Sequence, residues 1–277
     1  MTISTVPADL FYFVPPADGS RPFNTINADL KTGQRSRNWK PEEHAVEIEN
    51  VRGKEDEYTL DNAGFQYVQN KPKHTAFTND EDIEKEYYPE SIQLIKEVTG
   101  ASKVVLFDHT VRRHRPNVID SDPTKRQPVT QVHVDQTAAS ATARVHRHLP
   151  KEEAEQLVKK RFQIINLWRP ISHPAIDYPL TLCDYRSVDP AKDFVPVALI
   201  YSDREGETLG VIYNANHKWK FQKDMTPEEA VLIKCYDSLH DNNIAVCTPH
   251  TGFKDKTAPE DAPLRESIEL RALVFYD

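Results

Sequence analysis

Hydrophobic and polar residues alternate in short runs along most of the chain, and this rhythm predicts a protein built mainly from β-strands. Strands are expected where β-branched and aromatic residues recur at every second position. In the second part of the chain such runs occupy residues 103–113, 129–137, 162–171, 179–188, 194–202, 207–215, 244–253 and 265–276. Runs of this length, separated by Asp, Pro, Gly and Lys, are typical of a double-sheet jelly roll or a closed barrel.

The first hundred residues follow a different pattern. Residues 1–75 are polar and interrupted by Pro, Asn and Gly, with short apolar segments at 10–14 and 64–68. The first segment fits a strand, and the second fits a strand or a turn of helix. Residues 79–98 place apolar side chains at steps of three and four, which predicts a helix that ends at Gly100 as its C-cap.

Two further helices are expected later in the chain. Residues 151–162 begin with acids and end with bases, which suits a helix dipole. Residues 226–238 open with Thr, Pro and two Glu, a typical helix start, although their later half also fits a strand. Because no repeat or linker divides the sequence, we predict one domain over 1–277. Residues 1–100 are expected to be an extension packed on a barrel core at 101–277.

Composition narrows the class of function. The 277 residues include 35 basic and 43 acidic side chains, and the net charge of −8 argues against nucleic-acid binding. The three cysteines, Cys183, Cys235 and Cys247, form no C-x-x-C pair, which indicates a reducing compartment. The chain shows neither a signal-peptide pattern nor the run of about 20 apolar residues that spans a membrane. We predict a cytoplasmic protein that acts on a small molecule, with a homodimer as the default state.

The first chemical signal is the H-x-D sequence of His133 and Asp135. Residues i and i+2 of a strand point to the same side, so this pair can grip one metal ion. A distant histidine would complete the facial triad of non-haem Fe(II) oxygenases and leave positions open for a cosubstrate and O₂. His250, in CTPHTGF near the end of an apolar run, is the candidate third ligand. His217 and His240 are its rivals, and both fit exposed loops.

Each of these residues also has a structural explanation. Short polar pairs are common in strands, so His133 and Asp135 could form a hydrogen-bonded core pair, and His250 could be a loop histidine. His146 and His148 form an H-x-H pair, but the arginines beside them disfavour a bound cation. The H-x-D pair and the distant histidine therefore indicate a metal site only when they are considered together with other motifs.

The last predicted strand carries charged residues on one face. Arg265, Ser267, Glu269 and Arg271 share that face, whereas apolar residues occupy the other. A charge that faces a barrel interior is costly unless it is paired, and an arginine there can grip a carboxylate with two hydrogen bonds. The far carboxylate of 2-oxoglutarate is such a partner for Arg265, with Ser267 as an additional donor. Arg271 could take this role instead.

Other arginines have two open interpretations. Arg169 lies next to Trp168, and since neighbours point to opposite sides of a strand, one of them is expected to line the cavity. Arg169 could contact 2-oxoglutarate or an acidic substrate. Arg112, Arg113 and Arg115 form a basic cluster in an acidic protein, which either faces an acidic substrate or lies in a solvated loop.

The motifs taken together resemble the fungal hydroxylase/desaturase family of non-haem iron enzymes. That family includes gibberellin desaturases and oxygenases of polyketide, terpenoid and peptide biosynthesis. The resemblance implies a double-stranded β-helix, Fe(II), 2-oxoglutarate and O₂. It implies His133, Asp135 and His250 as metal ligands, and the R-x-S pair of Arg265 and Ser267 as the cosubstrate anchor. The matching segments, in family order, are FDHTVRR (107–113), VHVDQT (132–137), NLWRPI (166–171), LCDYRSV (182–188), CYDS (235–238), PHTGF (249–253) and RESIELRALVF (265–275).

The predicted function is therefore that of a 2-oxoglutarate-dependent dioxygenase of secondary metabolism. It would hydroxylate, desaturate or oxidatively cyclise a small specialised metabolite at a C–H bond. One alternative is a non-redox isomerase or hydrolase on a cupin-like barrel, in which the metal acts as a Lewis acid. A non-catalytic binding barrel is another. Release of succinate under air with Fe(II) and 2-oxoglutarate separates the first hypothesis from the other two.

Overall fold

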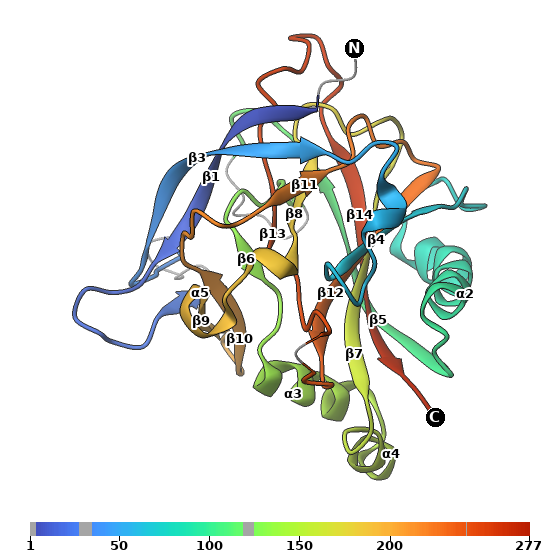
Figure 1. Ribbon diagram of the computed structural model, residues 1–277. Coiled ribbons are helices and arrows are strands. Elements are labelled where there is room, and N and C mark those ends of the chain that lie inside the picture. The colour runs from blue at the N-terminus through green and yellow to red at the C-terminus, as the bar shows by residue number, and fades with distance from the viewer. Residues whose placement is uncertain (1–3, 28–34, 119–124, 242) are drawn as a thin grey trace.

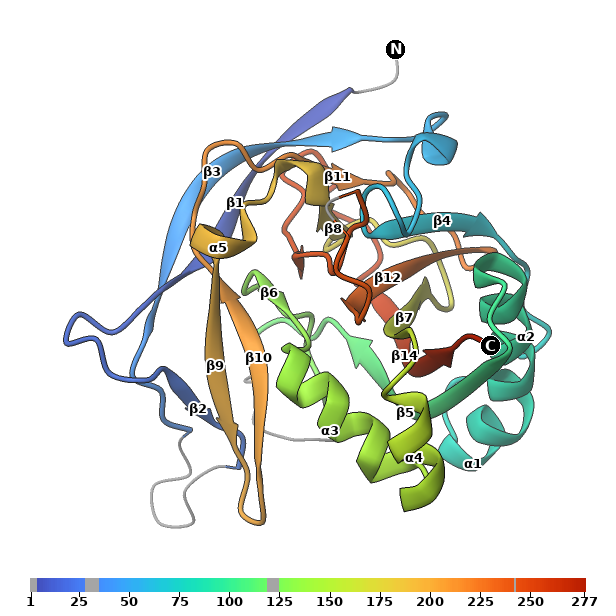
Figure 2. The same ribbon diagram turned by 60° about the horizontal axis from the view of Figure 1, so that its bottom comes forward.

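The computed structural model places the strands in two sheets that curl around a shared interior (Figures 1 and 2). It describes residues 4–27, 35–118, 125–241 and 243–277. The larger sheet contains, in spatial order, β1 (Thr5–Val14), β3 (Lys40–Asn50), β11 (Trp219–Phe221), β8 (Leu180–Cys183), β13 (His250–Gly252), β6 (His133–Val134), β10 (Glu205–Val211), β9 (Phe194–Ile200) and β2 (Phe23–Thr25). The smaller sheet contains β4 (Phe65–Gln69), β12 (Glu229–Asp237), β7 (Phe162–Pro170), β14 (Glu266–Phe275) and β5 (Lys103–Arg113).

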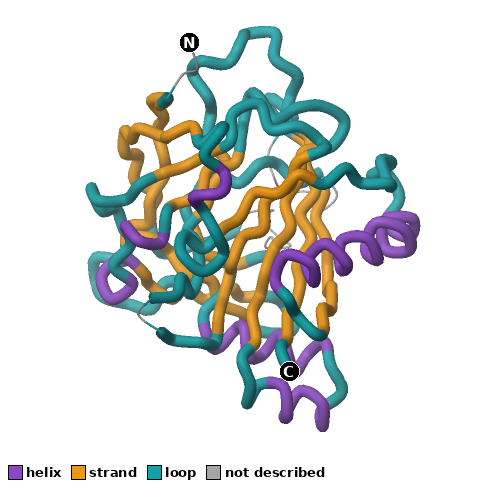
Figure 3. Tube along the Cα trace, turned by 45° about the vertical axis from the view of Figure 1, so that its right-hand side comes forward, coloured by secondary structure: helices purple, strands orange, loops and turns teal. Residues whose placement is uncertain are grey.

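The helices lie outside the two sheets. The α-helices are α1 (Asp80–Asp82), α2 (Tyr88–Thr99), α3 (Ala138–His148), α4 (Lys151–Leu157) and α5 (Pro190–Asp193). A π-helical turn, η2 (Ile83–Tyr87), joins α1 to α2, and single 3₁₀ turns form at η1 (Glu55–Glu57) and η3 (Tyr185–Ser187). Figure 3 shows α2 lying against one face of a sheet, and its apolar residues pack on the smaller sheet. Within the described residues, no helix has the length and apolarity needed to cross a bilayer.

The smaller sheet is buried on both faces, and every residue of β7 is accordingly buried. Ile164 and Trp168 point into the interior between the sheets, whereas Ile165 and Leu167 pack beneath α2. β14 divides in the same way. Its apolar members Ile268, Leu270, Ala272 and Val274 join the core beneath α2, and Glu269 and Arg271 take the inner face.

Most of the predicted elements are confirmed. The predicted strands at 103–113, 162–171 and 265–276 correspond to β5, β7 and β14, and the two predicted near 200 and 210 correspond to β9 and β10. The helix predicted at 79–98 is present, and Gly100 ends it in the left-handed conformation with φ of 70°. The N-terminal hundred residues, predicted as an extension on the barrel, supply strands to both sheets through β1, β3 and β4.

Several predicted elements are wrong or too long. The strand predicted at 179–188 contracts to β8, and the helix predicted at 151–162 ends earlier, at Leu157 in α4. The helix predicted at 226–238 is strand β12, because its later apolar residues are buried on both faces of the sheet. The strand predicted at 129–137 contracts to β6, and the one predicted at 244–253 contracts to β13. The small residues that follow β6 form helix α3, which begins with a capping box between Thr137 and Ser140.

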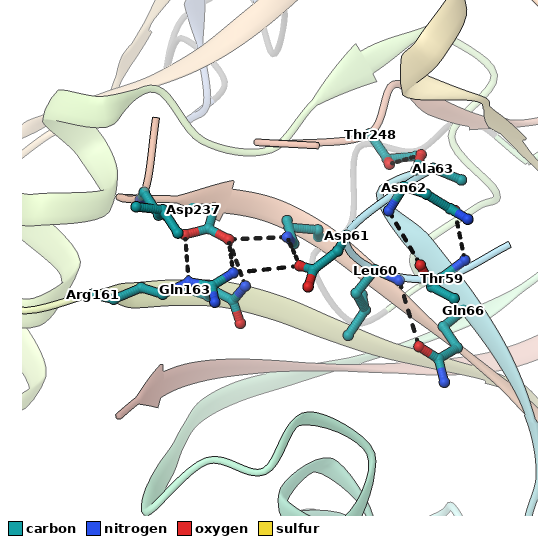
Figure 4. Close-up of polar contacts among 12 residues, drawn as sticks. Thr59, Leu60, Asp61, Asn62, Ala63, Gln66, Arg161, Gln163, Asp237 and Thr248 are labelled. Carbon is teal, nitrogen blue, oxygen red and sulfur yellow. Dashed lines mark hydrogen bonds and ion pairs between the residues drawn. The ribbon is translucent and has the colours of Figure 1, made fainter. Parts of the chain in front are cut away.

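A buried ionic cluster ties β12 to its surroundings (Figure 4). Lys234 is completely buried, and its Nζ lies 2.9 Å from Asp237 and 3.0 Å from Asp61. Asp237 also receives hydrogen bonds from Arg161 at 2.7 Å and from Gln163 at 2.6 Å. Burial alone would raise the pKa of Asp237, but Arg161 and Lys234 hold it below its ordinary value.

We expect the substitution Lys234→Met to lower the free energy of unfolding by about 3 kcal/mol, because it leaves a buried carboxylate with fewer cationic partners. Urea unfolding followed by circular dichroism measures the change. Lys192→Met is the matched control, since the Lys192 side chain is 80% exposed in its pair with Asp189 and should have no measurable effect. Equal stability of the Lys234 variant and the wild type would show that the cluster contributes nothing.

Candidate metal centre and cosubstrate pocket

Three predicted ligand residues converge on the inner face of the larger sheet. His133 on β6 pairs directly with His250 on β13, and Asp135 follows β6 by one residue. Their potential ligand atoms all lie within 4.8 Å of one another. His133 Nε2 lies 3.2 Å from an Asp135 carboxylate oxygen, and the two imidazole centroids are 4.5 Å apart. Among the described residues, no other group of three His, Cys, Asp or Glu side chains comes together in this way.

Backbone carbonyls orient both imidazoles. Nδ1 of His133 donates to the carbonyl oxygen of Gln131 at 2.8 Å, and Nδ1 of His250 donates to that of Thr248 at 3.0 Å. A carbonyl oxygen only accepts, so each Nδ1 carries a proton, and in the neutral form of either ring Nε2 is the nitrogen with the lone pair. This second layer of hydrogen bonds is the usual support for metal-binding histidines. Two imidazoles and a carboxylate are also the donor set expected for Fe(II) in a facial triad.

Neighbouring side chains hold the Asp135 carboxylate in place. Asn166 Nδ2 donates to Oδ2 of Asp135 at 2.7 Å, Arg271 Nε lies 3.7 Å from the same oxygen, and Cys235 Sγ lies 3.8 Å from it. Oδ1 is therefore the oxygen that faces His133. The sequence analysis missed Asn166 as a site residue. Its signal was its place two residues before Trp168, which puts both side chains on the inner face of β7.

The electrostatics of the three residues suit a cation. Burial would raise the pKa of Asp135, but His133, His250 and Arg271 hold it well below its ordinary value. Burial and the neighbouring His133 lower the pKa of His250. Burial also acts to lower the pKa of His133, but the hydrogen bond to Asp135 outweighs it and the pKa is raised. An ionised carboxylate beside a neutral imidazole is what metal binding requires, and a cation would replace the proton of His133.

A second feature is a buried cation that lacks an anionic partner. Arg265, immediately before β14, is 2% exposed, and Ser267 is 1% exposed. Nη1 of Arg265 donates to the Tyr178 carbonyl at 2.8 Å, and the guanidinium lies 5.5 Å from the Trp168 ring centroid. Within the described residues, Nε of Arg265 and Oγ of Ser267 have no hydrogen-bond partner, and Arg265 forms no ion pair. Burial and the nearby Arg112 lower the pKa of Arg265 to about 9.

These properties fit an anion-binding site. A buried charge and a buried hydroxyl are costly without partners, and an incoming carboxylate would satisfy both. Gly252 places this site relative to the triad, since it lies two residues from His250 and on the same side of β13. A Cβ atom at position 252 would be 3.0 Å from Arg265 Nη1. One small molecule with a carboxylate at each end could therefore extend from the histidine pair to Arg265.

Arg271, the second predicted anchor, already has anionic partners. Nη1 lies 2.9 Å from Asp108, Nη2 lies 2.9 Å from Glu269, and Nε faces Asp135. Burial would lower the pKa of Arg271, but these carboxylates outweigh burial and raise it. Its place in the site is thus to balance and orient carboxylates, whereas Arg265 has capacity for a further anion.

The prediction that Arg169 contacts 2-oxoglutarate is wrong. Arg169 follows Leu167 on the face of β7 that is turned away from the triad. Its guanidinium is used up within the fold, donating to the Tyr87 hydroxyl at 2.9 Å, the Pro227 carbonyl at 2.8 Å, and two oxygens of Asn70. Trp168, its neighbour, takes the inner position beside Arg265.

The rival histidines lie elsewhere. His217 was predicted to be exposed, but its side chain is 1% exposed and hydrogen-bonds to Asp193 at 3.0 Å. His240 is exposed after β12. His146 and His148 lie on α3, and His148 stacks on an aromatic ring rather than joining a cluster of ligands.

A cavity of about 780 Å³ opens onto the triad and is lined by His133, Asp135 and Arg271. Apolar residues of β1, β9 and β10 form another part of its wall, including Phe13, Val197 and Leu209. The cavity is of the size that holds a small molecule. A molecule bound there would contact the candidate metal centre directly.

Comparisons with known proteins agree with this site. The profile of a family described as "Oxidoreductase/YMDC permease-like domain" matches residues 10–275. The hydroxylase/desaturase efuI of Hormonema carpetanum is 35% identical over 99% of this chain and 96% of its own length. The Fe(II)/2-oxoglutarate-dependent dioxygenase nvfI of Aspergillus novofumigatus is 31% identical over 95% of this chain and 94% of its own.

The fold also matches solved structures. The structure of the iron and alpha-ketoglutarate-dependent endoperoxidase NvfI superposes with a TM-score of 0.84, at 27% identity, over 99% of this chain and 98% of that chain. The mainly β architecture predicted from the sequence is therefore confirmed, and the curled sheets are consistent with a double-stranded β-helix.

We expect Asp135→Ala to weaken Mn(II) binding by at least about 100-fold, because even residues that only support metal ligands change affinity by 10- to 100-fold. Isothermal titration of the apoprotein with Mn(II), used as a redox-inert substitute, measures the effect. Asp189→Ala is the control, since that carboxylate lies at the surface near α5. An Asp135 variant that binds Mn(II) as tightly as the wild type would remove this residue from the ligand set.

Proposed function

The chain belongs to the fungal family of Fe(II)/2-oxoglutarate-dependent dioxygenases and hydroxylase/desaturases of secondary metabolism, and from this premise we propose how its residues serve the reaction. It is an oxidoreductase that uses Fe(II), 2-oxoglutarate and O₂ and acts on a small molecule. The relatives give no support to the alternative of a non-redox isomerase or hydrolase. Nor do they support a non-catalytic barrel, since those named are enzymes.

His133, Asp135 and His250 hold the iron in this proposal. The observation that carries it is the convergence of two histidines and one carboxylate, with each Nδ1 bonded to a backbone carbonyl so that Nε2 is the nitrogen turned toward the other ligand residues. Bound Fe(II) supplies the oxidation of a substrate C–H bond, coupled to conversion of 2-oxoglutarate and O₂ into succinate and CO₂. Three protein ligands leave coordination positions for the cosubstrate and for O₂. Asn166 and Arg271 support the reaction by keeping Asp135 in one orientation.

Arg265 and Ser267 bind the far carboxylate of 2-oxoglutarate. Support comes from their burial, from the atoms they leave without partners among the described residues, and from the short distance between Gly252 and Arg265. Trp168 provides a flat apolar surface beneath the guanidinium. Binding the cosubstrate there would fix its orientation before the substrate reacts.

The reaction outcome depends on where the cavity holds the substrate. Relatives are named hydroxylase, desaturase and endoperoxidase, so one scaffold supports several outcomes. Excluding water and positioning one carbon are the contributions that a protein of this kind makes. We propose that this chain hydroxylates, desaturates or oxidatively cyclises a specialised metabolite. The single domain, the cytoplasmic location and the homodimer stay predictions from the sequence.

We expect the Fe(II)-loaded protein to release succinate from 2-oxoglutarate under air, slowly even without substrate. Liquid chromatography with mass detection measures succinate. The His250→Ala variant is the control, because it lacks one proposed ligand and should fall to the background of free Fe(II). Succinate at background level in the wild type, with iron bound, would refute the proposed reaction.

We expect Arg265→Ala to raise the KM for 2-oxoglutarate by about 10- to 100-fold, since hydrogen bonds to a charged group contribute about 1.5–3 kcal/mol. Arg265→Lys should retain part of the affinity, because it keeps the charge but loses the bidentate geometry. Succinate formation at varied 2-oxoglutarate gives both values. If Arg271→Ala raises the KM more than Arg265→Ala does, the anchor is misassigned.

A further inference from the structure

The substrate cavity is cationic although the whole chain is acidic. The chain carries a net charge of −8, yet among the described residues that line the cavity of about 780 Å³, six are arginines and two are aspartates. These arginines are Arg35, Arg37, Arg112, Arg126, Arg144 and Arg271. The charge of these lining residues is therefore opposite in sign to the net charge of the chain.

The two aspartates of the cavity are already committed. Asp108 and Asp135 both pair with Arg271, at 2.9 and 3.7 Å, and Asp135 is also a proposed iron ligand. A second, smaller cavity adjoins this one, and Glu205 and Glu207 are part of its lining. Both of these carboxylates form ion pairs with Arg21. None of these four carboxylates forms an ion pair with Arg144.

Arg144 is the most informative of these arginines. It projects from α3, which lies beside β10 at one end of the space between the sheets (Figures 1 and 2). Of the six, it is the one that also lines the adjoining cavity, of about 360 Å³, so it stands where the two spaces meet. The side chain is half-buried and its guanidinium lies 5.3 Å from the Phe107 ring centroid. It forms no ion pair with any carboxylate of the described residues.

The surroundings of Arg144 penalise its charge. Burial lowers its pKa, and the nearby Arg271 and Arg147 act in the same direction against Asp108. A half-buried guanidinium among other cations is stabilised when an anion arrives, because the anion supplies the missing partner and the hydrogen bonds. Arginine is well suited to this role because its planar donors match a carboxylate.

Another part of the cavity lining is apolar. Phe13, Trp39 and Val197 form a buried cluster there, and Leu199 also lines the cavity from β9. A ligand that satisfies both parts of the lining must combine an apolar body with a negative group. A purely polar anion would leave the apolar part without contacts, and a neutral apolar compound would leave Arg144 without an ion pair.

We propose that the substrate is an organic acid with an apolar skeleton, and that Arg144 binds its carboxylate. This inference rests on the proposed function, since it assigns the substrate class of the same site. Arg265 serves the cosubstrate and Arg144 the substrate, so two separate anion sites flank the candidate iron centre. The arginine-rich entrance also attracts an anion from solution, which an acidic protein would otherwise repel.

The test uses two fluorescent probes with the same aromatic frame. The first, 8-anilinonaphthalene-1-sulfonate, carries one negative charge, and the second, N-phenyl-1-naphthylamine, is its neutral counterpart. Each is titrated into protein loaded with Mn(II) and saturating 2-oxoglutarate, so that the cosubstrate site is filled. We expect the anionic probe to bind with a dissociation constant about tenfold lower than that of the neutral probe.

The variants identify the residue responsible. Arg144→Gln should raise the dissociation constant of the anionic probe about tenfold and leave that of the neutral probe unchanged, which also shows that the cavity is intact. Arg144→Lys should raise the dissociation constant of the anionic probe by a smaller factor, because the positive charge is kept. Arg186→Gln is the matched control, because Arg186 pairs with Asp184 at 52% exposure outside both cavities and should change neither probe.

Three outcomes would overturn the proposal. They are equal affinity of the wild type for both probes, no effect of Arg144→Gln on the anionic probe, and an equal effect of Arg186→Gln. Probe binding needs no turnover, so these outcomes are independent of succinate release. Loss of the probe preference with normal succinate release would reject the organic-acid substrate and keep the oxygenase. Tighter binding of the anionic probe without any succinate release would keep the anion site and reject the oxygenase.

Discussion

The site depends on one strand pairing, that of β6 with β13. Both strands are very short, with two and three residues, yet their antiparallel register sets His133 opposite His250. Residues directly opposite each other in such a pair have neighbouring side chains, so a contact across more than a hundred residues of sequence follows from backbone hydrogen bonds. β8 and β10, on either side, fix these two strands within the larger sheet. The ligand geometry therefore comes from the sheet rather than from a flexible loop.

The inner face of β14 shows how buried charge can separate structural roles from binding roles. Arg271 lies opposite Asp108 in the pairing with β5 and is balanced by carboxylates on its own and neighbouring strands. Arg265, six residues earlier on the same face, has only a carbonyl oxygen as its side-chain hydrogen-bond partner among the described residues. A cation that the fold already neutralises gains little from another anion, whereas an unbalanced one gains much. The number of carboxylate partners thus distinguishes Arg265 from Arg271, whereas their positions in the sequence do not.

Much of this arrangement was predictable from period-two patterns. The alternation in 265–275 separated the charged face from the apolar face, and the H-x-D spacing put His133 and Asp135 on one side. The errors came where tertiary context overrides local preference. Thr-Pro-Glu-Glu is a strong helix start, but burial on both faces makes the residues after it a strand. Arg169 is part of the NLWRPI motif, but its position in β7 turns its side chain away from the triad. Helix α3 was not predicted, although Thr137 and Ser140 carried a capping signal.

That missed helix changes how the cavity is understood. Without α3, the residues after Asp135 would simply leave room for a substrate, and the arginines of 144–147 would count only against a metal at the neighbouring histidines. In this helix Arg144 and Arg147 are three residues apart and therefore lie on the same side. Arg144 borders both cavities and Arg147 borders the smaller one. The feature that disfavours a bound cation at His146 and His148 is the same feature that favours a bound anion a turn away. The positive charge of these arginines therefore disfavours a metal ion and favours an anionic ligand.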